Sequence, residues 1–547
     1  MLNKEFDSKR EDMLSYLENN VYGKWRTGEK VSYEKLEDNK LKITVEANGR
    51  TAAFEAGYLL PEKTEERHCG KFPFFICLHP IMDYMAAIEK GYAYFYLNSL
   101  QVASDDYKHN GAFYELYPYT EEADSQTGVL MAWGWAASKL LDAVYNGLGR
   151  ELNLDCANSL VTGVSRWGKA VAVLGVFDKR FRMVIPACSG AGGLALYSYK
   201  STGRSYDLTM VGGPADYVYG ENEPLSCLQS DGERGWFVDK FLDYKSEADF
   251  PYDQDILPKL AAGGNRSYFI VAAHMGEDWV NAPSMWECYL LAKDYYESEL
   301  LGNRLFTNFH KAGHAVLAED FEKITAAFDS LYYQDWWIEK YKLLEEYRKA
   351  NKSVKKGGVI FTGSSLMEMF PVEKFAKEDG LELNIYNRAV SGYVTDDLMA
   401  VLDLCVIEPE PSKIYINIGT NDLSNDLLSL EEVMAKYETI LTEIISKLPK
   451  ATITLMAYYP INFSAAIDKG MERTLTIRSN EKILAANERV KALAAKLGLR
   501  YIDVNAPLTD ADGNLKKEFC IDGMHITEEG YRSIWPLIKE DLRNICI

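Results

Sequence analysis

Positive charge is scarce in this sequence, and long apolar runs are missing from it. Lys and Arg together number 60 against 81 Asp and Glu, so the formal net charge is −21. So acidic a chain offers no basic surface to neutralise phosphates, which argues against nucleic acid or an anionic membrane as a partner. No apolar stretch approaches the roughly 20 residues that a membrane-spanning helix requires, so we expect no such helix.

A secretory leader and a cysteine framework are missing as well. Residues 1–14, MLNKEFDSKREDML, contain neither the apolar core nor the small-residue cleavage site of a signal peptide. The nine cysteines are scattered and odd in number, a pattern that predicts neither a disulfide framework nor a zinc site. We therefore expect a reduced, cytoplasmic protein without a bound metal. A polymeric substrate would then reach this protein only as fragments that have been imported into the cell.

The length and the order of apolar segments predict two α/β domains. At 547 residues the chain is too long for one compact core. From residue 72 onward, short apolar runs alternate with helical patterns, as in a parallel sheet covered by helices. A segment rich in Lys and Glu then predicts a solvated helix. We expect an α/β domain over residues 1–335, a helical linker over 336–356 and a second, smaller α/β domain over 357–547.

The first candidate site is a serine turn in the first domain. In GVSRWG, Ser165 stands between Gly163 and Gly168, and the second glycine lies one residue further away than in the usual G-x-S-x-G motif. A predicted strand, 159–162, precedes the turn, and a predicted helix, 169–177, follows it. This order is the context of a nucleophile elbow, whose tight backbone turn requires small residues.

Several motifs around this turn occur in the same order in a known family. They are WGWAASKLLD, TGVSRWGKA, IPACSGAGGLALY, FPYDQDILPKL, GEDWVNAP and KAGHAV. Over about residues 13–328 the chain thereby resembles the glucuronoyl esterase family of carbohydrate esterases. The resemblance implies an α/β-hydrolase fold with the chain order Ser, acid, His. By position it implies Ser165 as nucleophile, His314 as base, Arg166 as a contributor to oxyanion binding and Lys169 as a contact for sugar hydroxyls.

The acid and the sugar-recognition residues are less directly implied. Many members of the family carry a glutamate immediately before SGAGG, where this chain has Cys188. The other acid position of this fold points to Asp278, with Glu277 as the alternative. A uronate-recognising glutamate follows a glycine in the family, whereas Arg204 follows Gly203 here. We expect Trp236 and Trp279 either to stack on sugars or to be buried structural residues, and His310 to be an ordinary surface or packing histidine.

The second domain contains four spaced blocks: VIFTGSSLMEMFP, NRAVSGYVTDDL, INIGTNDLSND and DGMHITEEGY. Over about residues 359–542 they resemble the SGNH (GDSL-like) hydrolases, which implies a flavodoxin-like three-layer α/β/α fold. The resemblance implies Ser365 as the nucleophile and Gly392 and Asn421 as the oxyanion donors. It implies Asp522 as the acid and His525 as the base.

The three-residue spacing of Asp522 and His525 lets the carboxylate reach Nδ1 of the imidazole while Nε2 faces the serine. We expect Asp422 to brace the loop that holds Asn421. Ser364 stands where the family usually has Asp, a variant that resembles enzymes removing acetyl groups from sugars or short esters.

Three functions remain open at this stage. The first is a bifunctional carbohydrate esterase on hemicellulose-derived oligosaccharides, with two serine sites that work through acyl-enzymes and without metal or cofactor. The second is a single active SGNH acetylesterase whose N-terminal domain binds carbohydrate or acts as a scaffold. The third is a short-chain lipid or thioester hydrolase, against which stands the lack of a long apolar lid segment.

Overall fold

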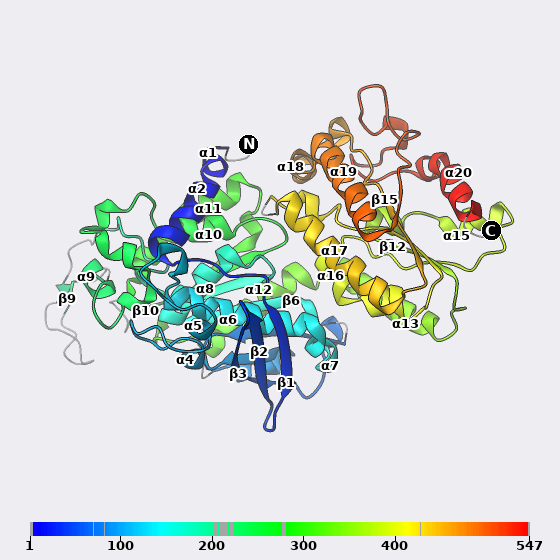
Figure 1. Cartoon of the computed structure of the whole chain (residues 1–547). Helices are drawn as coiled ribbons and strands as arrows, with labels where there is room; N and C mark the ends of the chain where they lie inside the picture. Colours follow the sequence, from blue (N-terminus) through cyan, green and yellow to red (C-terminus); the bar gives the residue numbers. More distant parts are fainter. Residues whose placement is uncertain are drawn as a thin grey trace. The chain divides into compact units, whose positions relative to one another are not determined.

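The computed structural model divides into two compact units, residues 1–334 and 335–547. It describes residues 4–68, 70–80, 83–200, 205–206, 217–218, 223–275, 280–426 and 428–544. Among these residues, no helix is both long and apolar enough to cross a membrane. Both units combine strands and helices, in agreement with the predicted α/β class (Figure 1).

The first unit is built on a sheet with the strand order β1-β2-β3-β5-β4-β6-β7-β10-β11. The strands are β1 (Lys30–Lys35), β2 (Lys40–Ala47), β3 (Arg50–Leu59), β4 (Phe72–Cys77), β5 (Ala93–Leu97), β6 (Leu154–Val164), β7 (Met183–Ala187), β10 (Ser267–Met275) and β11 (Leu305–Ala312). From β5 to β11 all neighbours are parallel, whereas β1, β2 and β3 form an antiparallel edge that the sequence reasoning did not anticipate. A separate two-stranded ribbon pairs β8 (Ser205–Tyr206) with β9 (Tyr217–Val218).

Helices follow most of the parallel strands. They are α1 (Lys4–Ser8), α2 (Arg10–Tyr16), α3 (Met85–Glu89), α4 (Ser99–Val102), α5 (Ala112–Leu116), α6 (Val129–Ala143), α7 (Gly149–Glu151), α8 (Arg166–Phe177), α9 (Leu225–Leu228), α10 (Ile256–Ala261), α11 (Ala282–Ser298) and α12 (Ala318–Tyr332). Helix α6 is followed by a π-helical turn, Val144–Leu148.

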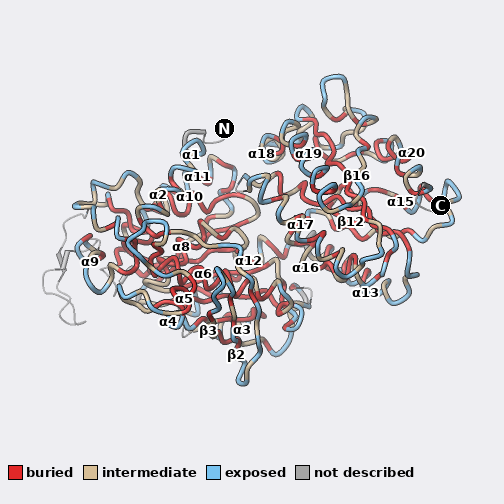
Figure 2. The backbone as a smooth tube through the Cα atoms, in the orientation of Figure 1, coloured by how far each residue is buried: buried red, intermediate tan, exposed pale blue. Residues whose placement is uncertain are grey.

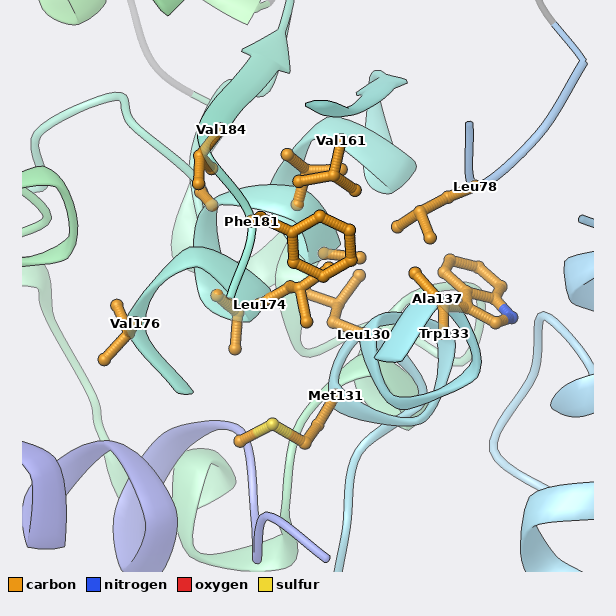
Figure 3. Close-up of a cluster of buried hydrophobic side chains, with 14 of the residues drawn as sticks. Leu78, Leu130, Met131, Trp133, Ala137, Val161, Leu174, Val176, Phe181 and Val184 are labelled. Atoms are coloured by element: carbon orange, nitrogen blue, oxygen red, sulfur yellow. The ribbon is translucent and has the colours of Figure 1, made fainter. Parts of the chain in front are cut away.

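The core of the first unit lies where α6 and α8 pack on the parallel strands. Buried residues gather around α6 and α8 (Figure 2). Every residue of β4 is buried, as expected for a strand covered on both faces. Figure 3 shows the side chains of α6 and α8 meeting those of β6 and β7. A Cβ at Gly134 of α6 would lie only 3.1 Å from the Leu174 Cβ of α8, so a glycine there lets the two helices approach closely. This packing holds the start of α8, and with it Ser165, against the sheet.

The second unit has a parallel sheet with the order β13-β12-β14-β15-β16. Its strands are β12 (Val359–Gly363), β13 (Ile385–Asn387), β14 (Lys413–Asn417), β15 (Thr452–Met456) and β16 (Arg500–Ile502). Its helices are α13 (Asp335–Asn351), α14 (Ser365–Glu368), α15 (Val372–Glu378), α16 (Thr395–Ala400), α17 (Leu430–Lys447), α18 (Lys469–Ile477), α19 (Asn480–Leu497) and α20 (Glu528–Asn544).

The segment expected as a linker forms most of α13, and this helix packs on the second unit. Its Tyr347 hydroxyl donates to the carbonyl oxygen of Ala389 (2.8 Å), and its Asn351 side-chain amide donates to that of Leu404 (2.8 Å). These contacts explain why α13 belongs to the compact unit that begins at residue 335.

Candidate active sites

The second unit brings its candidate nucleophile to the carboxyl end of the sheet. Strand β12 ends at Gly363, and α14 begins at Ser365. A Cβ at Gly363 would lie 2.0 Å from the carbonyl oxygen of Asn417, and its φ of 149° favours glycine. The loops that follow β13 and β14 begin at the same edge, which is where parallel α/β sheets bind ligands.

Ser365, His525 and Asp522 form a continuous hydrogen-bonded chain. The His525 Nε2 lies 2.9 Å from the Ser365 Oγ, and the Nδ1 lies 2.7 Å from the Asp522 Oδ2. The Asp522 Oδ1 also accepts the backbone N–H groups of His525 (2.9 Å) and Met524 (3.1 Å). A carboxylate on Nδ1 requires the N–H there, so the lone pair of Nε2 faces the serine hydroxyl.

The electrostatics of this chain keep the acid ionised. Partial burial by itself raises the pKa of Asp522. The hydrogen bonds from the His525 side chain and from two backbone amides outweigh that effect and hold the pKa well below its usual value. The carboxylate thus orients the imidazole and stabilises the imidazolium that forms when the serine proton is taken up.

The two candidate oxyanion donors lie on loops that charged side chains hold in place. Gly392 has a φ of 77°, and the backbone N–H of its neighbour Ser391 donates to the carboxylate of Glu368. The Asn421 side-chain amide donates to the carbonyl oxygen of Tyr393 (3.0 Å). Its oxygen accepts from the Arg478 guanidinium (2.7 Å), a residue that the sequence reasoning did not single out.

Asp422 ties the Asn421 loop to the start of α16. Its carboxylate accepts the backbone N–H (3.0 Å) and the hydroxyl (2.6 Å) of Thr395, which agrees with the bracing role expected from the sequence. Burial raises the pKa of Asp422 to about 6, although Lys436 opposes the shift.

The first unit holds Ser165 in a strained turn between β6 and α8. Its φ of 62° and ψ of −127° are uncommon for a residue with a side chain, and such strain is typical of a nucleophile elbow. The Ser165 N–H donates to the carbonyl oxygen of Ala187 at the end of β7 (3.0 Å). A Cβ at Gly163 would lie 2.7 Å from the Trp167 carbonyl oxygen, and one at Gly168 would lie 2.3 Å from that of Ala187. Both glycines are therefore required by close backbone approach.

His314 lies in the loop between β11 and α12, the position expected for the last member of an α/β-hydrolase triad. His310 is buried, with Nδ1 2.8 Å from the Asp320 carboxylate and Nε2 2.9 Å from the Gly313 carbonyl oxygen. It packs and shapes this loop, as expected. Among the described residues, His310, Glu319 and Asp320 bring possible metal-ligand atoms within 4.8 Å of one another. Both ring nitrogens of His310 already face protein oxygens, so this group forms a hydrogen-bonded network.

The two carboxylates that the sequence pointed to as partners of His314 cannot be placed beside it. Asp278, Glu277 and Trp279 lie outside the described residues, as does Arg204. Cys188 is buried, has a φ of 47°, and its thiol lies 3.8 Å from the carbonyl oxygen of Ala315, next to His314. The position where the resemblance led us to expect a glutamate thus faces the histidine loop with a thiol.

Charged and aromatic side chains gather beside Ser165. Arg166 pairs with Asp105 (2.5 Å), whose other oxygen accepts the Trp236 indole N–H (2.7 Å). The Trp236 ring also packs 5.5 Å from the Arg166 guanidinium and 5.5 Å from the Lys169 ammonium. Trp236 is only 2% exposed, so the expectation of an open sugar-stacking face is wrong for this residue. Of the two alternatives, the buried structural tryptophan is correct, because both cations cover the ring.

Two glutamates near Lys169 were missed by the sequence reasoning. The Lys169 ammonium, buried in the fold, contacts the Glu223 carboxylate (2.7 Å) and the Ala191 carbonyl oxygen (2.7 Å). One carboxylate oxygen of Glu233 is buried without a hydrogen-bond partner among the described residues. Burial and the charge of Glu223 raise the pKa of Glu233 to about 7, against the opposing charges of Lys169 and Arg166. For Glu223, the signal available in the sequence was the acidic run GENE at residues 220–223.

Comparison with known proteins identifies one family in each unit. The protein-family model described as glucuronyl esterase of fungi matches residues 43–300 of the sequence. The protein-family model of the GDSL-like lipase/acylhydrolase family matches residues 370–533. The second match begins after Ser365, so the contact between Ser365 and His525 links the nucleophile to that domain independently of the match.

Two relatives that match part of the chain are named as esterases. A multidomain esterase of Ruminococcus flavefaciens is 43% identical over 62% of this chain and 45% of its own length. A 4-O-methyl-glucuronoyl methylesterase of Hypocrea jecorina is 29% identical over 33% of this chain and 35% of its own length. The matches thus span less than half the length of these two relatives.

A solved structure agrees with the fold of the first unit. A carbohydrate esterase family 15 glucuronoyl esterase from Caldicellulosiruptor kristjansonii aligns with a TM-score of 0.53 and 31% identity, over 60% of this chain and 86% of that chain. Both resemblances and the α/β-hydrolase-plus-SGNH fold class are thereby confirmed. The chain belongs to the glucuronoyl esterase family of carbohydrate esterases, and it carries in addition a GDSL-like acylhydrolase domain of the SGNH type.

Proposed function

We propose that the chain is a bifunctional carbohydrate esterase acting on oligosaccharides derived from xylan or mannan. In this proposal the second unit removes O-acetyl groups, and the first unit cleaves a sugar ester of the glucuronoyl or acyl type. The observation that carries the proposal is the chain from Ser365 through His525 to Asp522, at 2.9 and 2.7 Å. These distances are those required for proton transfer during acyl transfer.

The proposed reaction of the second unit follows from this geometry. The Ser365 oxygen attacks the ester carbonyl carbon while its proton passes to Nε2 of His525. The backbone N–H of Gly392 and the side-chain amide of Asn421 stabilise the negative oxygen of the tetrahedral intermediate. Collapse of the intermediate transfers the proton to the leaving sugar oxygen and leaves an acetyl-enzyme. Water, activated by His525, then releases acetate.

The first unit is proposed to work through Ser165 and His314. The strained turn that exposes Ser165 at the end of β6 and the adjacent Arg166 support an acyl-transfer site. Two relatives are named 4-O-methyl-glucuronoyl methylesterase, which favours a uronoyl ester as substrate. The thiol of Cys188 beside the His314 loop favours a second candidate, in which only the SGNH unit is active and the first unit binds carbohydrate.

A mass-spectrometric screen of defined substrates separates these alternatives. The wild type, Ser165→Ala, Ser365→Ala and the double variant would be incubated with acetylated and methyl-glucuronoyl xylo- and manno-oligosaccharides. Loss of a triad serine removes a large part of catalysis, so we expect Ser365→Ala to lower acetate release at least about 10³-fold. The matched control is Ser364→Ala, which removes the neighbouring hydroxyl and leaves the nucleophile in place.

Each outcome of the screen decides between the functions. Uronoyl-ester cleavage that depends on Ser165 supports two active sites. Cleavage that is the same in Ser165→Ala, together with weaker oligosaccharide binding after deletion of residues 1–334, would favour the single-site alternative. A rate with nitrophenyl esters that rises beyond about eight acyl carbons would favour a lipid or thioester hydrolase, since longer chains bury more apolar surface. Undiminished turnover in both serine variants would refute the esterase proposal.

A further inference from the structure

Arg478 is a buried arginine that connects two loops of the SGNH site. It caps the C-terminal end of α18 at the junction with α19 and is only 2% exposed. Its guanidinium donates to the side-chain oxygen of Asn421 (2.7 Å), to the Ser424 hydroxyl (2.7 Å) and to the Met524 sulfur (3.3 Å). Asn421 is the candidate oxyanion donor, and Met524 immediately precedes His525. One side chain thus contacts the oxyanion loop and the loop of the acid and base.

The contact with Arg478 fixes which end of the Asn421 amide faces the reaction. A guanidinium has N–H donors and no acceptor, so only the amide oxygen can face it. The Asn421 NH2 group must therefore point the other way, where one of its hydrogens donates to the Tyr393 carbonyl oxygen (3.0 Å). The remaining hydrogen is free to donate to a substrate oxygen. Without Arg478, the amide could turn over and present its oxygen to a developing negative charge.

The charge of Arg478 is also unusual for a buried group. In the described part of the chain, the three groups that accept its hydrogen bonds are all uncharged. Burial lowers the pKa of Arg478 to about 10, against the attraction of Asp422 and Asp522, so the guanidinium remains protonated at neutral pH. A buried cation without a directly bonded anion is costly in the resting protein. That cost is relieved when a negative oxygen forms nearby, which is a contribution specific to the transition state.

We propose that Arg478 is a positioning residue of the SGNH site, which locks the Asn421 amide toward the oxyanion and places a fixed positive charge behind it. The proposal rests on the proposed function of this site as a serine hydrolase. It is independent of which ester the enzyme prefers, because the oxyanion forms in every acyl transfer.

The test measures how fast the serine reacts with a fluorophosphonate. In this reaction the Ser365 oxygen bonds to phosphorus, fluoride leaves, the proton passes to His525, and negative charge builds up on the phosphoryl oxygen. The full chain with Ser165→Ala would be used, so that label arises at one of the two candidate nucleophiles, and the site would be verified by peptide mass spectrometry. The variants are Arg478→Gln, which removes the charge, and Arg478→Lys, which retains it, each with and without Asn421→Ala.

Loss of one oxyanion donor typically costs about 10²- to 10³-fold, and we expect Arg478→Gln to slow labelling about 10²-fold. Arg478→Lys should slow labelling about tenfold, because lysine keeps the positive charge but makes fewer of the hydrogen bonds. In the Asn421→Ala background, both losses should shrink to about threefold or less, because the orientation of the amide no longer matters and only the direct effect of the charge remains. Arg473→Met is the matched control, because this arginine of α18 pairs with Asp426 and should leave the rate unchanged.

A purely structural role gives a different result. Arg478→Gln would then lower the melting temperature while the folded variant labels at the wild-type rate, and this outcome overturns the proposal. Losses that multiply fully with Asn421→Ala overturn it as well. If the Gln variant does not fold, the Lys variant carries the same comparison. An unlabelled Ser365 in the parent protein contradicts both the site and the proposal, whereas labelling without release of acetate from sugars contradicts only the proposed substrate.

Discussion

Replacing Asp422 by Asn should make the SGNH unit more stable at neutral pH and remove a pH dependence of its stability. Asp422 is 1% exposed and accepts two hydrogen bonds from Thr395. Asn can keep both contacts. Its oxygen accepts the backbone N–H of Thr395, and its NH2 group donates to the Thr395 hydroxyl, which then accepts a hydrogen bond instead of donating one. The variant therefore loses the buried charge without losing the connection between the two loops.

The magnitude follows from the shift of the pKa. The pKa of Asp422 is about 6 in the folded protein, against an ordinary value of 3.8, because burial disfavours the charged form. The native state thus binds the proton more tightly than the unfolded chain. The free energy of unfolding therefore falls as the pH rises from about 4 to about 6 and stays low above that window. Two pKa units correspond to about 3 kcal/mol at most. The Asn variant resembles the protonated acid and keeps this stability at pH 7 to 8.

Differential scanning calorimetry of the full chain at several pH values between 4 and 8 measures the effect. For a domain of about 200 residues, 1 kcal/mol shifts the melting temperature by roughly 2–4 °C. We expect the transition of the SGNH unit to move up by as much as about 6–12 °C at pH 8 and to coincide with that of the wild type near pH 4. Parallel pH profiles of the two proteins would refute the reasoning, as would an Asn variant that is less stable than the wild type at pH 8.

Three further predictions have defined outcomes. Asp522→Asn cannot hold the required tautomer of the base and should lower nitrophenyl acetate hydrolysis by the SGNH site about 10⁴-fold with an unchanged circular dichroism spectrum; a loss below tenfold would contradict the triad. Gly363→Ala places a Cβ 2.0 Å from a backbone oxygen of β14 and should destabilise the unit by at least about 3 kcal/mol in urea unfolding, so wild-type stability would refute the close approach. Lys139→Met leaves the carboxylate of Glu29 buried without its cation and should lower the free energy of unfolding by about 3–5 kcal/mol. Lys30→Met breaks an exposed ion pair and should lower it by less than about 1 kcal/mol. Equal losses would show that burial does not determine the contribution of these ion pairs to stability.

Local sequence was sufficient for the parts of each site that lie close together in the chain or on regular elements. The turn around Ser165 could be predicted because a strand, two glycines and a helix follow one another. The pairing of Asp522 with His525 could be predicted because three residues on one turn bring the two side chains together. The parallel strands were visible because they are apolar on both faces, as in β4. The antiparallel edge β1-β2-β3 was missed although its two hairpins are local, because its partly exposed strands lack the continuous apolar runs of the parallel strands.

The sequence by itself determined the two α/β domains, the order of their motifs and the chemistry of the candidate nucleophiles and bases. Only the tertiary structure decided which side chains surround them. Nothing local distinguishes Arg478 from the nearby Arg473, yet the fold buries Arg478 against Asn421. Trp236 is likewise covered by Arg166 and Lys169 instead of facing a sugar. Burial and the identity of a neighbour depend on contacts between residues far apart in the chain, and these contacts set the charge, the orientation and the accessibility of each group.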